Sequence, residues 1–197
     1  MVNSLLLGGG AIAGIVVGAV AVVVLIFVIW WFSTRNKFVK LQNIVEEAWS
    51  TIDVSCKKRY DLIPNLVETV KGYAKHESET MSAVIKARQM AINATGDAKI
   101  DAEKELSVSL SRFLTATREA YPDLKANANF MSLQNQLTAI ENELASARRY
   151  YNGTVKEFNT KIDLFPSSIV GRRMRLEKRK YFELDSAEER QNVKVQF

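Results

Sequence analysis

The chain opens on a long apolar run and then changes to a repeating pattern of apolar and polar positions. No residue between Leu5 and Phe32 is charged, and almost none is polar. The hydrocarbon core of a bilayer is about 30 Å thick and is crossed by about 20 apolar helical residues. The run exceeds this length, so it predicts a transmembrane helix over residues 5–32, with residues 1–4 as a short extracytoplasmic N-terminus.

The flanks of this run indicate that it is retained in the membrane and that the rest of the chain is cytoplasmic. A cleaved secretory signal needs a basic start and a small-residue cleavage site, whereas residues 1–4 hold no Lys or Arg and the distal end is aromatic. The first charged residues beyond it are basic, and such residues stay on the cytoplasmic side. We therefore expect an interface anchor made of Trp30, Trp31, Arg35, Lys37 and Lys40.

Beyond the run, apolar residues recur three and four positions apart, the spacing of a helix packed in a bundle or coiled coil. The first such stripe comprises Phe38, Leu41, Val45, Ala48 and Ile52. Residues 33–40 hold neither Gly nor Pro, so we expect the membrane helix to continue into this stripe as one rod. A first break is expected at residues 59–64, where Asp61 caps a second helix and Pro64 lies in its first turn.

Three further stripes complete a bundle. The second helix is expected to end near residues 94–97, and the third to run from about residue 98 to 120, before Tyr121-Pro122-Asp123. The fourth runs from Phe130 to Ile162, and Phe165-Pro166 closes it. Four long amphipathic helices with short links are typical of an antiparallel bundle. The pattern predicts an all-α protein with a cytoplasmic bundle over residues 33–164.

The tail, residues 165–197, concentrates positive charge. Within the nine residues 172–180, six basic residues accompany one acid, Glu177, and the local excess of +5 equals the net charge of the whole chain. Such a cluster contacts anionic lipid, is solvated or internally paired, or binds nucleic acid, which we favour least. If the helices alternate in direction, the fourth returns toward the bilayer, and we expect possible headgroup contacts at Arg172, Arg173, Arg175, Lys178, Arg179 and Lys180. The last residues, 193–197, alternate like a short strand that pairs with residues 180–182.

Small residues recur within the apolar run. Gly10, Gly14 and Gly18 are four positions apart, so they share one helix face and let another backbone approach closely. We expect this face to support a homo-oligomer within the lipid bilayer. The alternative is that glycine is simply common in membrane helices.

Catalytic and metal-binding patterns are missing from the sequence. The single cysteine, Cys56, excludes an internal disulfide and lies in a helical stripe, which favours a core position over a nucleophile. His76 stands in a segment similar to the start of a zinc-protease helix, but the second histidine four residues later is missing. We expect no enzyme, no metal and no cofactor.

Amide and arginine side chains offer one further possibility. We expect them to form hydrogen bonds between helices rather than a ligand pocket. The set comprises Asn43, Asn65, Asn127, Asn129, Gln134, Gln136, Asn152, Asn159 and the pair Arg148-Arg149.

Several segments together resemble the LemA family. They are residues 48–54 (AWSTIDV), 59–74 (RYDLIPNLVETVKGYA), 121–127 (YPDLKAN) with Asn129-Phe130, 147–152 (ARRYYN), Phe165-Pro166 and Tyr181-Phe182. The resemblance implies a bacterial inner-membrane protein with a short outer N-terminus, one crossing and a cytoplasmic bundle of long antiparallel helices. No enzymatic activity is established for the family. This chain departs from it at Cys56, where an aliphatic residue is usual, and in the basic character of its tail.

These features favour a non-enzymatic, self-associating membrane scaffold that binds or remodels the inner leaflet. The alternative is a membrane-tethered adaptor or signalling module whose bundle recruits a protein partner such as a membrane protease.

Overall fold

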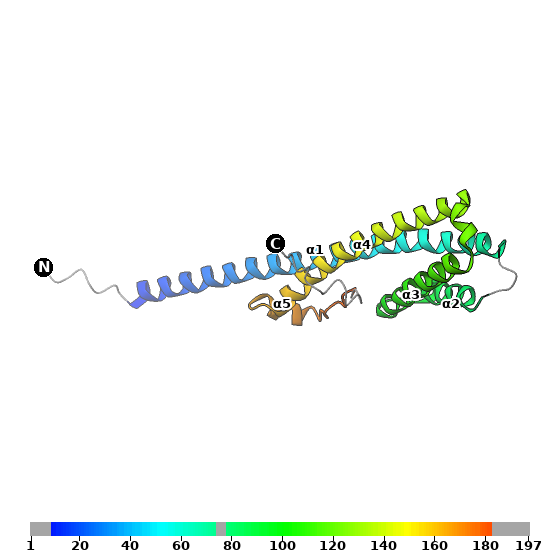
Figure 1. Ribbon diagram of the computed structural model, residues 1–197. Coiled ribbons are helices and arrows are strands. Elements are labelled where there is room, and N and C mark those ends of the chain that lie inside the picture. Colours follow the sequence, from blue (N-terminus) through cyan, green and yellow to red (C-terminus); the bar gives the residue numbers. More distant parts are fainter. Residues whose placement is uncertain (1–8, 74–77, 183–197) are drawn as a thin grey trace, which may run out of the picture. The chain divides into compact units, whose positions relative to one another are not determined.

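The protein is all-α throughout the described part of the chain, as the sequence predicts. The structure is a computed structural model that describes residues 9–73 and 78–182. Its elements are α1 (Gly9–Lys71), α2 (Glu79–Asn93), α3 (Asp97–Ala120), the 3-10 helix η1 (Pro122–Ala126), α4 (Ala128–Asp163) and α5 (Ser167–Arg173). Figure 1 shows these helices in chain order. His76 and the expected strand at residues 193–197 lie outside the described residues.

The first helix is much longer than any other. α1 runs without interruption for 63 residues, which confirms that the apolar run continues into the bundle as one rod. The expected break at residues 59–64 is wrong, because Pro64 lies inside α1. Residues 61–71 therefore do not start a second helix. That helix is α2, which begins later and is capped by Ser78, whose Oγ accepts a hydrogen bond from the Met81 amide at 3.3 Å.

A tertiary contact explains why the helix continues past Pro64. Proline lacks an N–H, so the carbonyl four residues earlier, that of Tyr60, loses its helical partner. In this fold, Arg88 Nε of α2 donates a hydrogen bond to the Tyr60 carbonyl oxygen at 2.7 Å. The guanidinium of α2 thus replaces the missing amide of α1.

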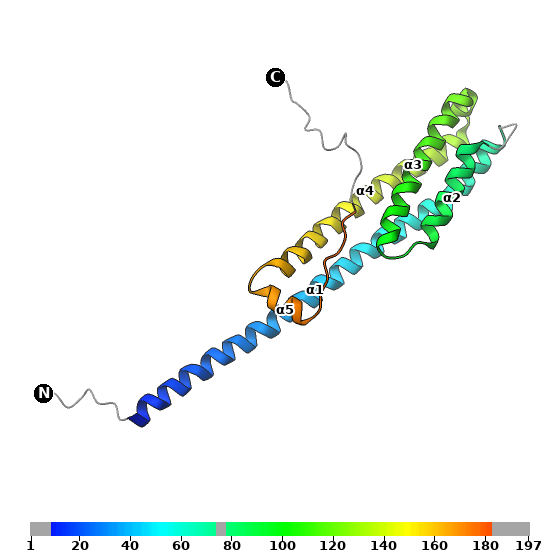
Figure 2. The ribbon, with the colours of Figure 1, turned by 90° about the horizontal axis from the view of Figure 1, so that it is seen from below.

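The described residues form two compact units that share α1 and α4. Unit 1 comprises residues 9–45 and 156–179, and unit 2 comprises residues 46–73, 78–155 and 180–182. In unit 2, α2 and α3 run side by side, as both Figure 1 and Figure 2 show.

Unit 1 packs around one aromatic contact. The rings of Phe38 on α1 and Phe158 on α4 meet edge to face, with their centroids 6.4 Å apart. Gly171 of α5 lies against Phe38, so that a Cβ at this glycine would stand 3.4 Å from the ring. Asn159 of α4 fixes the segment after α5, since its amide both donates to and accepts from the Arg179 backbone at 2.9 Å.

In unit 2 another asparagine of α4 holds the backbone of the C-terminal segment in the same way. The Asn152 side chain exchanges two hydrogen bonds of 2.8 Å with the backbone of Phe182. The Phe182 ring packs with Trp49 and Tyr151, at centroid distances of 5.7 and 6.0 Å. Asn152 and Asn159 therefore hold the C-terminal segment against α4 instead of joining one helix to another. Asn127, directly before α4, does connect two helices, because its side chain donates a hydrogen bond of 2.7 Å to the hydroxyl of Tyr73, which follows α1.

A buried ion network crosses the interior of unit 2. Arg59 of α1 has no exposed surface. Its guanidinium donates to Glu103 of α3, which is equally buried, to Glu141 of α4 at 2.8 Å and to Ser107 at 2.9 Å. The Tyr60 hydroxyl also donates to Glu103. Three helices thus contribute to one hydrogen-bonded group.

The network controls the ionisation of its members. Burial alone would lower the pKa of Arg59, but the carboxylates of Glu141 and Glu103 outweigh it and raise that pKa. Burial, and then the hydrogen bond to Glu103, raise the pKa of Tyr60. Arg148 lies beside the network, and burial followed by the charge of Arg59 lowers its pKa.

Cys56 borders the same network. Its side chain is fully buried and unpaired, which confirms the expected core position. Burial, followed by the negative charge of Glu103, raises the pKa of the Cys56 thiol to about 12. The thiolate is the reactive form of cysteine, so this residue is poorly placed to act as a nucleophile.

Removal of the buried cation is predicted to destabilise the chain strongly. Arg59→Met leaves the buried Glu103 carboxylate with only the Arg148 guanidinium, 3.9 Å away, as a counter-charge, and losing one partner of such a buried pair costs about 3–5 kcal/mol. The measurement is the free energy of unfolding of the full chain in detergent, followed by circular dichroism.

Two comparisons make this test specific. Arg59→Met combined with Glu103→Gln should recover part of the loss, because no buried charge then remains between these two positions. Lys58→Met removes an exposed pair with Glu143 and should have a much smaller effect. Equal losses for Arg59→Met and Lys58→Met would contradict the role of the network.

The Pro64–Arg88 relation predicts a non-additive pair of substitutions. Arg88→Met should destabilise the chain by about 1–3 kcal/mol, because the buried Tyr60 carbonyl loses a charged donor. In a Pro64→Ala background residue 64 regains its N–H, and the same substitution should cost much less. A double-mutant cycle on the unfolding free energy measures the difference. Additive effects would show that Arg88 does not substitute for the proline amide.

The raised pKa of Cys56 predicts a slow native thiol. At pH 8.5 the thiolate population should be roughly a thousandfold below that of a cysteine at the reference value of 9.0. Alkylation by iodoacetamide should therefore be slow in the folded chain and rapid after denaturation, as mass spectrometry can follow. Comparable rates in the two states would contradict a sealed core position.

Candidate functional site

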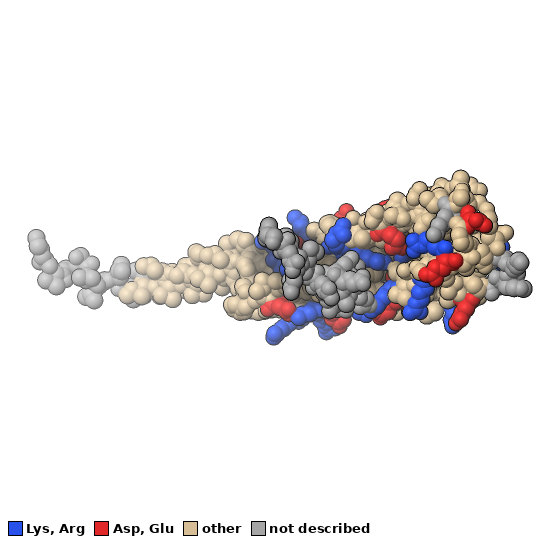
Figure 3. All heavy atoms as spheres, viewed as in Figure 1, with Lys and Arg blue, Asp and Glu red and all other residues tan. Residues whose placement is uncertain are grey.

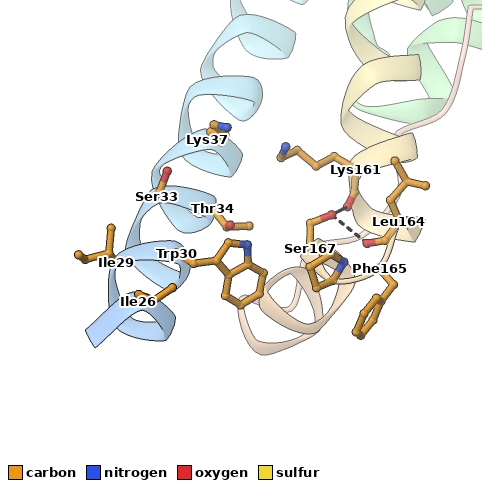
Figure 4. A pocket seen from close by; sticks show the side chains of 11 residues that line it. Ile26, Ile29, Trp30, Ser33, Thr34, Lys37, Lys161, Leu164, Phe165 and Ser167 are labelled. Atoms are coloured by element: carbon orange, nitrogen blue, oxygen red, sulfur yellow. Dashed lines mark hydrogen bonds between the residues drawn. The ribbon is translucent and has the colours of Figure 1, made fainter. Parts of the chain in front are cut away.

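A cleft opens in unit 1 where the apolar part of α1 gives way to its first polar residues. On one side is α1, and on the other is the turn that joins α4 to α5 (Figure 4). Its volume is about 510 Å³. The lining residues are Ile26, Ile29, Trp30, Ser33, Thr34 and Lys37 of α1, with Lys161 of α4, Leu164, Phe165 and Pro166 of the turn, and Ser167 of α5.

The α1 wall of the cleft follows from helical spacing. Residues 26, 30, 34 and 37 recur every three or four positions and therefore share one face of the helix. The same face continues into Phe38, Leu41 and Val45, which are buried. α4 ends at Asp163, so the part of the α1 face nearer the N-terminus is bordered by the turn after α4 instead of by a full helix.

The opposite wall is fixed by hydrogen bonds. The Ser167 hydroxyl lies 2.8 Å from two carbonyl oxygens, those of Lys161 and Leu164, and donates toward them. Figure 4 shows the Lys161 side chain extending across the cleft toward α1. These contacts hold the turn so that its apolar residues and Lys161 border the same space.

The cleft changes in polarity along its length. Ile26, Ile29 and Phe165 lie toward one end and Lys37 and Lys161 toward the other (Figure 4), with no acidic residue among the lining side chains. Trp30 is only partly exposed and projects into the cleft in Figure 4. Thr34 points into it as well and is only 7% exposed.

The turn also exposes large apolar side chains. Phe165 is 82% exposed, and Leu164 beside it is 57% exposed. Nearby on α5, Ile169 is also exposed. Clustered apolar residues of this kind mark contact surfaces for other molecules. In the sequence, Phe165-Pro166 marks the end of a helix and forms part of the family resemblance, but it gives no sign of an exposed apolar surface.

The predicted interface anchor is only partly gathered at the cleft. Trp30 and Lys37 line it, whereas Trp31, Arg35 and Lys40 do not. Phe27 packs against both tryptophan rings, at centroid distances of 5.5 and 6.2 Å. The three basic residues are exposed. Their role at a membrane interface stays a prediction.

The predicted glycine face lies on the exposed apolar part of α1. Apart from the neighbouring residues and backbone of α1 itself, no described atom lies within 4 Å of a Cβ built on Gly14 or Gly18, and Gly10 belongs to the same helix. This segment is long and apolar enough to cross a membrane, and none of it is buried. Figure 3 shows it as a stretch without charged side chains on the visible face.

The basic cluster of the tail is divided by its contacts. Lys178 pairs with Asp163 at 2.8 Å in unit 1, and Lys180 pairs with Asp101 at 3.0 Å in unit 2. Within the part of the chain that the structure describes, no ion pair involves the four arginines: Arg172, Arg173, Arg175 and Arg179.

The basic cluster includes the backbone turn that ends α5. The Arg175 amide donates to the Arg172 carbonyl, and the Leu176 amide donates to the Gly171 carbonyl, at 3.0 and 3.1 Å. These two bonds form a Schellman motif, in which the residue after the helix has a left-handed conformation. Arg175 takes that position with φ 54°, where glycine is usual. The fold thus places an arginine at a position that disfavours side chains.

Catalytic groupings are not apparent in the described ranges. No set of three or more His, Cys, Asp or Glu side chains is arranged there to hold a metal ion. Arg59, Glu103 and Cys56 are buried. The features open to other molecules are therefore the cleft, the exposed turn, the glycine face and the unpaired arginines.

Comparison with known proteins agrees with the resemblance found in the sequence. The model of the LemA family matches residues 48–197. A curated relative, Protein LemA of Metamycoplasma hominis, is 28% identical over 149 residues, which are 72% of this chain. The chain spans only 65% of the length of that relative. Since the family model covers unit 2 and the α4–α5 region of unit 1, the chain belongs to the LemA family.

Proposed function

We propose that the chain is a non-enzymatic membrane scaffold that self-associates through the glycine face of α1 and contacts the inner leaflet of a bacterial membrane. The observation behind this proposal is the uninterrupted helix α1, whose apolar residues 12–29 are exposed and include the open Gly14 and Gly18 positions.

The proposed orientation follows from charge. Arg35, Lys37 and Lys40 are exposed directly after the apolar segment, and basic residues at this place stay on the cytoplasmic side of a membrane. The N-terminus then lies outside and the bundle lies in the cytoplasm.

Self-association is supported by the space around the glycines. In lipid, apolar side chains gain little from meeting each other, so helix pairing depends on close backbone approach at small residues. Among the described residues, nothing beyond the local backbone of α1 comes within 4 Å of a Cβ built at Gly14 or Gly18. Because α1 has no break between Gly18 and Phe38, pairing of two apolar segments also brings two copies of unit 1 together.

Contact with the inner leaflet is supported by the unpaired arginines. Arg172 and Arg173 are exposed at the end of α5, whose turn borders the cleft beside the apolar segment of α1. A basic residue near an anionic leaflet contributes about 1 kcal/mol to membrane binding. Several copies in one assembly would add these contributions and favour membrane remodelling.

A second candidate function is recruitment of a protein partner, such as a membrane protease. It is favoured by an open groove of about 560 Å³ in unit 2. α1 and α4 both line this groove, which mixes charged, amide and aliphatic side chains: Lys58, Asp61, Leu62, Asn65, Gln136, Ala139, Ile140 and Glu143. A monomer that purifies with one stoichiometric protein would favour this function over the scaffold.

The scaffold predicts that bulk on the glycine face prevents association. Gly14→Leu with Gly18→Leu should lower the fraction of crosslinked oligomer in native membranes by about tenfold, because two backbones then lose their close contact. Crosslinking in membranes, followed by size measurement after detergent extraction, provides the readout.

A matched control uses the other faces of the same helix. Ala13→Leu with Ala19→Leu adds similar bulk about 120° away on either side of the glycine face, given 3.6 residues per turn. This control should associate like the natural chain. Finding only monomer in every variant, or an oligomer that ignores the glycine substitutions, would overturn the proposed interface.

A further inference from the structure

We propose that the cleft of unit 1 is a binding site for one anionic phospholipid of the inner leaflet, with its phosphate between Lys37 and Lys161. The inference rests on the proposed placement of the apolar part of α1 in a membrane. It adds a specific lipid site to what is otherwise a general attraction between a basic surface and a bilayer.

The first argument is charge. Two lysines line the same end of the cleft, one from α1 and one from α4, and no lining residue is acidic. No ion pair engages either amine within the described part of the chain. Two ammonium groups bordering one small space repel each other unless an anion lies between them. A phosphodiester supplies the required charge and accepts hydrogen bonds from both amines.

The second argument is an unpartnered hydroxyl. Thr34 is 7% exposed and points into the cleft (Figure 4). Its hydroxyl makes no hydrogen bond to any described residue. The Thr34 oxygen is not sealed from the cleft, since the buried side-chain atoms without a partner do not include it, and Thr34 lies one helical turn from Lys37 on the same face. A headgroup oxygen in the cleft would satisfy this hydroxyl.

The third argument is the order of polar and apolar residues along the helix. From Ile26 to Lys37 the wall extends over about 16 Å, at 1.5 Å per residue. Along this length it passes from isoleucine through tryptophan and threonine to lysine, the same order in which a lipid passes from acyl chain to headgroup. Tryptophan prefers the boundary between these two layers.

The exposed turn completes the site. Phe165 lies toward the apolar end of the cleft and Leu164 beside Lys161 (Figure 4), and both side chains are largely exposed. Beside acyl chains these side chains would be covered by hydrocarbon, which removes the disadvantage of their exposure to water. The occupant that matches both ends is therefore a phospholipid and not a free phosphate ion, which would leave the apolar end uncovered.

The test measures lipid binding by the full-length chain. The protein is purified in a mild detergent and titrated with phosphatidylglycerol or phosphatidylcholine, and native mass spectrometry counts the bound lipids. The natural chain should bind one phosphatidylglycerol at least tenfold more tightly than phosphatidylcholine. Lys37→Gln with Lys161→Gln should abolish this preference, and Thr34→Val should weaken it.

The control variant loses the same number of positive charges at positions outside the cleft. Lys57→Gln with Lys86→Gln removes two exposed lysines of unit 2 and should leave the preference intact. Circular dichroism melts of each variant establish that it is folded. An equal loss in this control, or an undiminished preference in the cleft variant, would overturn the proposal.

Two further measurements distinguish the phospholipid site from a free phosphate site and from the proposed scaffold. Millimolar inorganic phosphate should not displace the lipid, and efficient displacement would identify a free phosphate site and refute the lipid. The Lys37→Gln, Lys161→Gln chain should still form crosslinked oligomers, and the Gly14→Leu, Gly18→Leu chain should still bind phosphatidylglycerol. The scaffold and the lipid site therefore fail independently.

Discussion

The buried guanidinium of Arg59 imposes the strictest constraint on unit 2. A full positive charge with no exposed surface requires carboxylates, and these come from Glu103 of α3 and Glu141 of α4. The contact of both carboxylates with one guanidinium fixes how α1, α3 and α4 align. A register shift in any of these helices would leave a buried charge without a partner. The surrounding apolar residues provide packing, while the ion network selects one arrangement of them. Burial, together with Glu103 of this network, raises the pKa values of Tyr60 and Cys56.

Close to this network, α1 contains Pro64 in its interior. A helix interior disfavours proline because one carbonyl loses its amide partner, and Arg88 of α2 supplies a donor to that carbonyl. In sequence, Arg88 is a polar residue on the otherwise apolar stripe of α2, and this was the one available sign of its role. The local rule at Pro64 is thus overruled by a contact between residues 28 positions apart.

α1 extends beyond the end of its partner helix α4. The face that packs Phe38 against Phe158 continues toward the N-terminus past the end of α4. There the partner helix is replaced by a turn, and the result is a cleft with lysines at one end and apolar residues at the other. The proposed lipid site and the proposed scaffold both depend on this feature, since each needs the apolar segment of α1 to lie in a bilayer while unit 1 stays at its surface.

The sequence by itself determined the helical class, the apolar segment, its continuity with the bundle and the extent of the third and fourth helices. These follow from spacing and composition, which are local properties. It also predicted Cys56 as a core residue. It treated the basic tail as one cluster, whereas Lys178 and Lys180 are engaged by Asp163 and Asp101. Only the tertiary structure decided the continuation of α1 past Pro64, the ion network around Arg59 and the placement of Lys37 and Lys161 at the same cleft. Each of these joins residues far apart in the chain, and periodicity along one helix holds no information about which residue of another helix will face it.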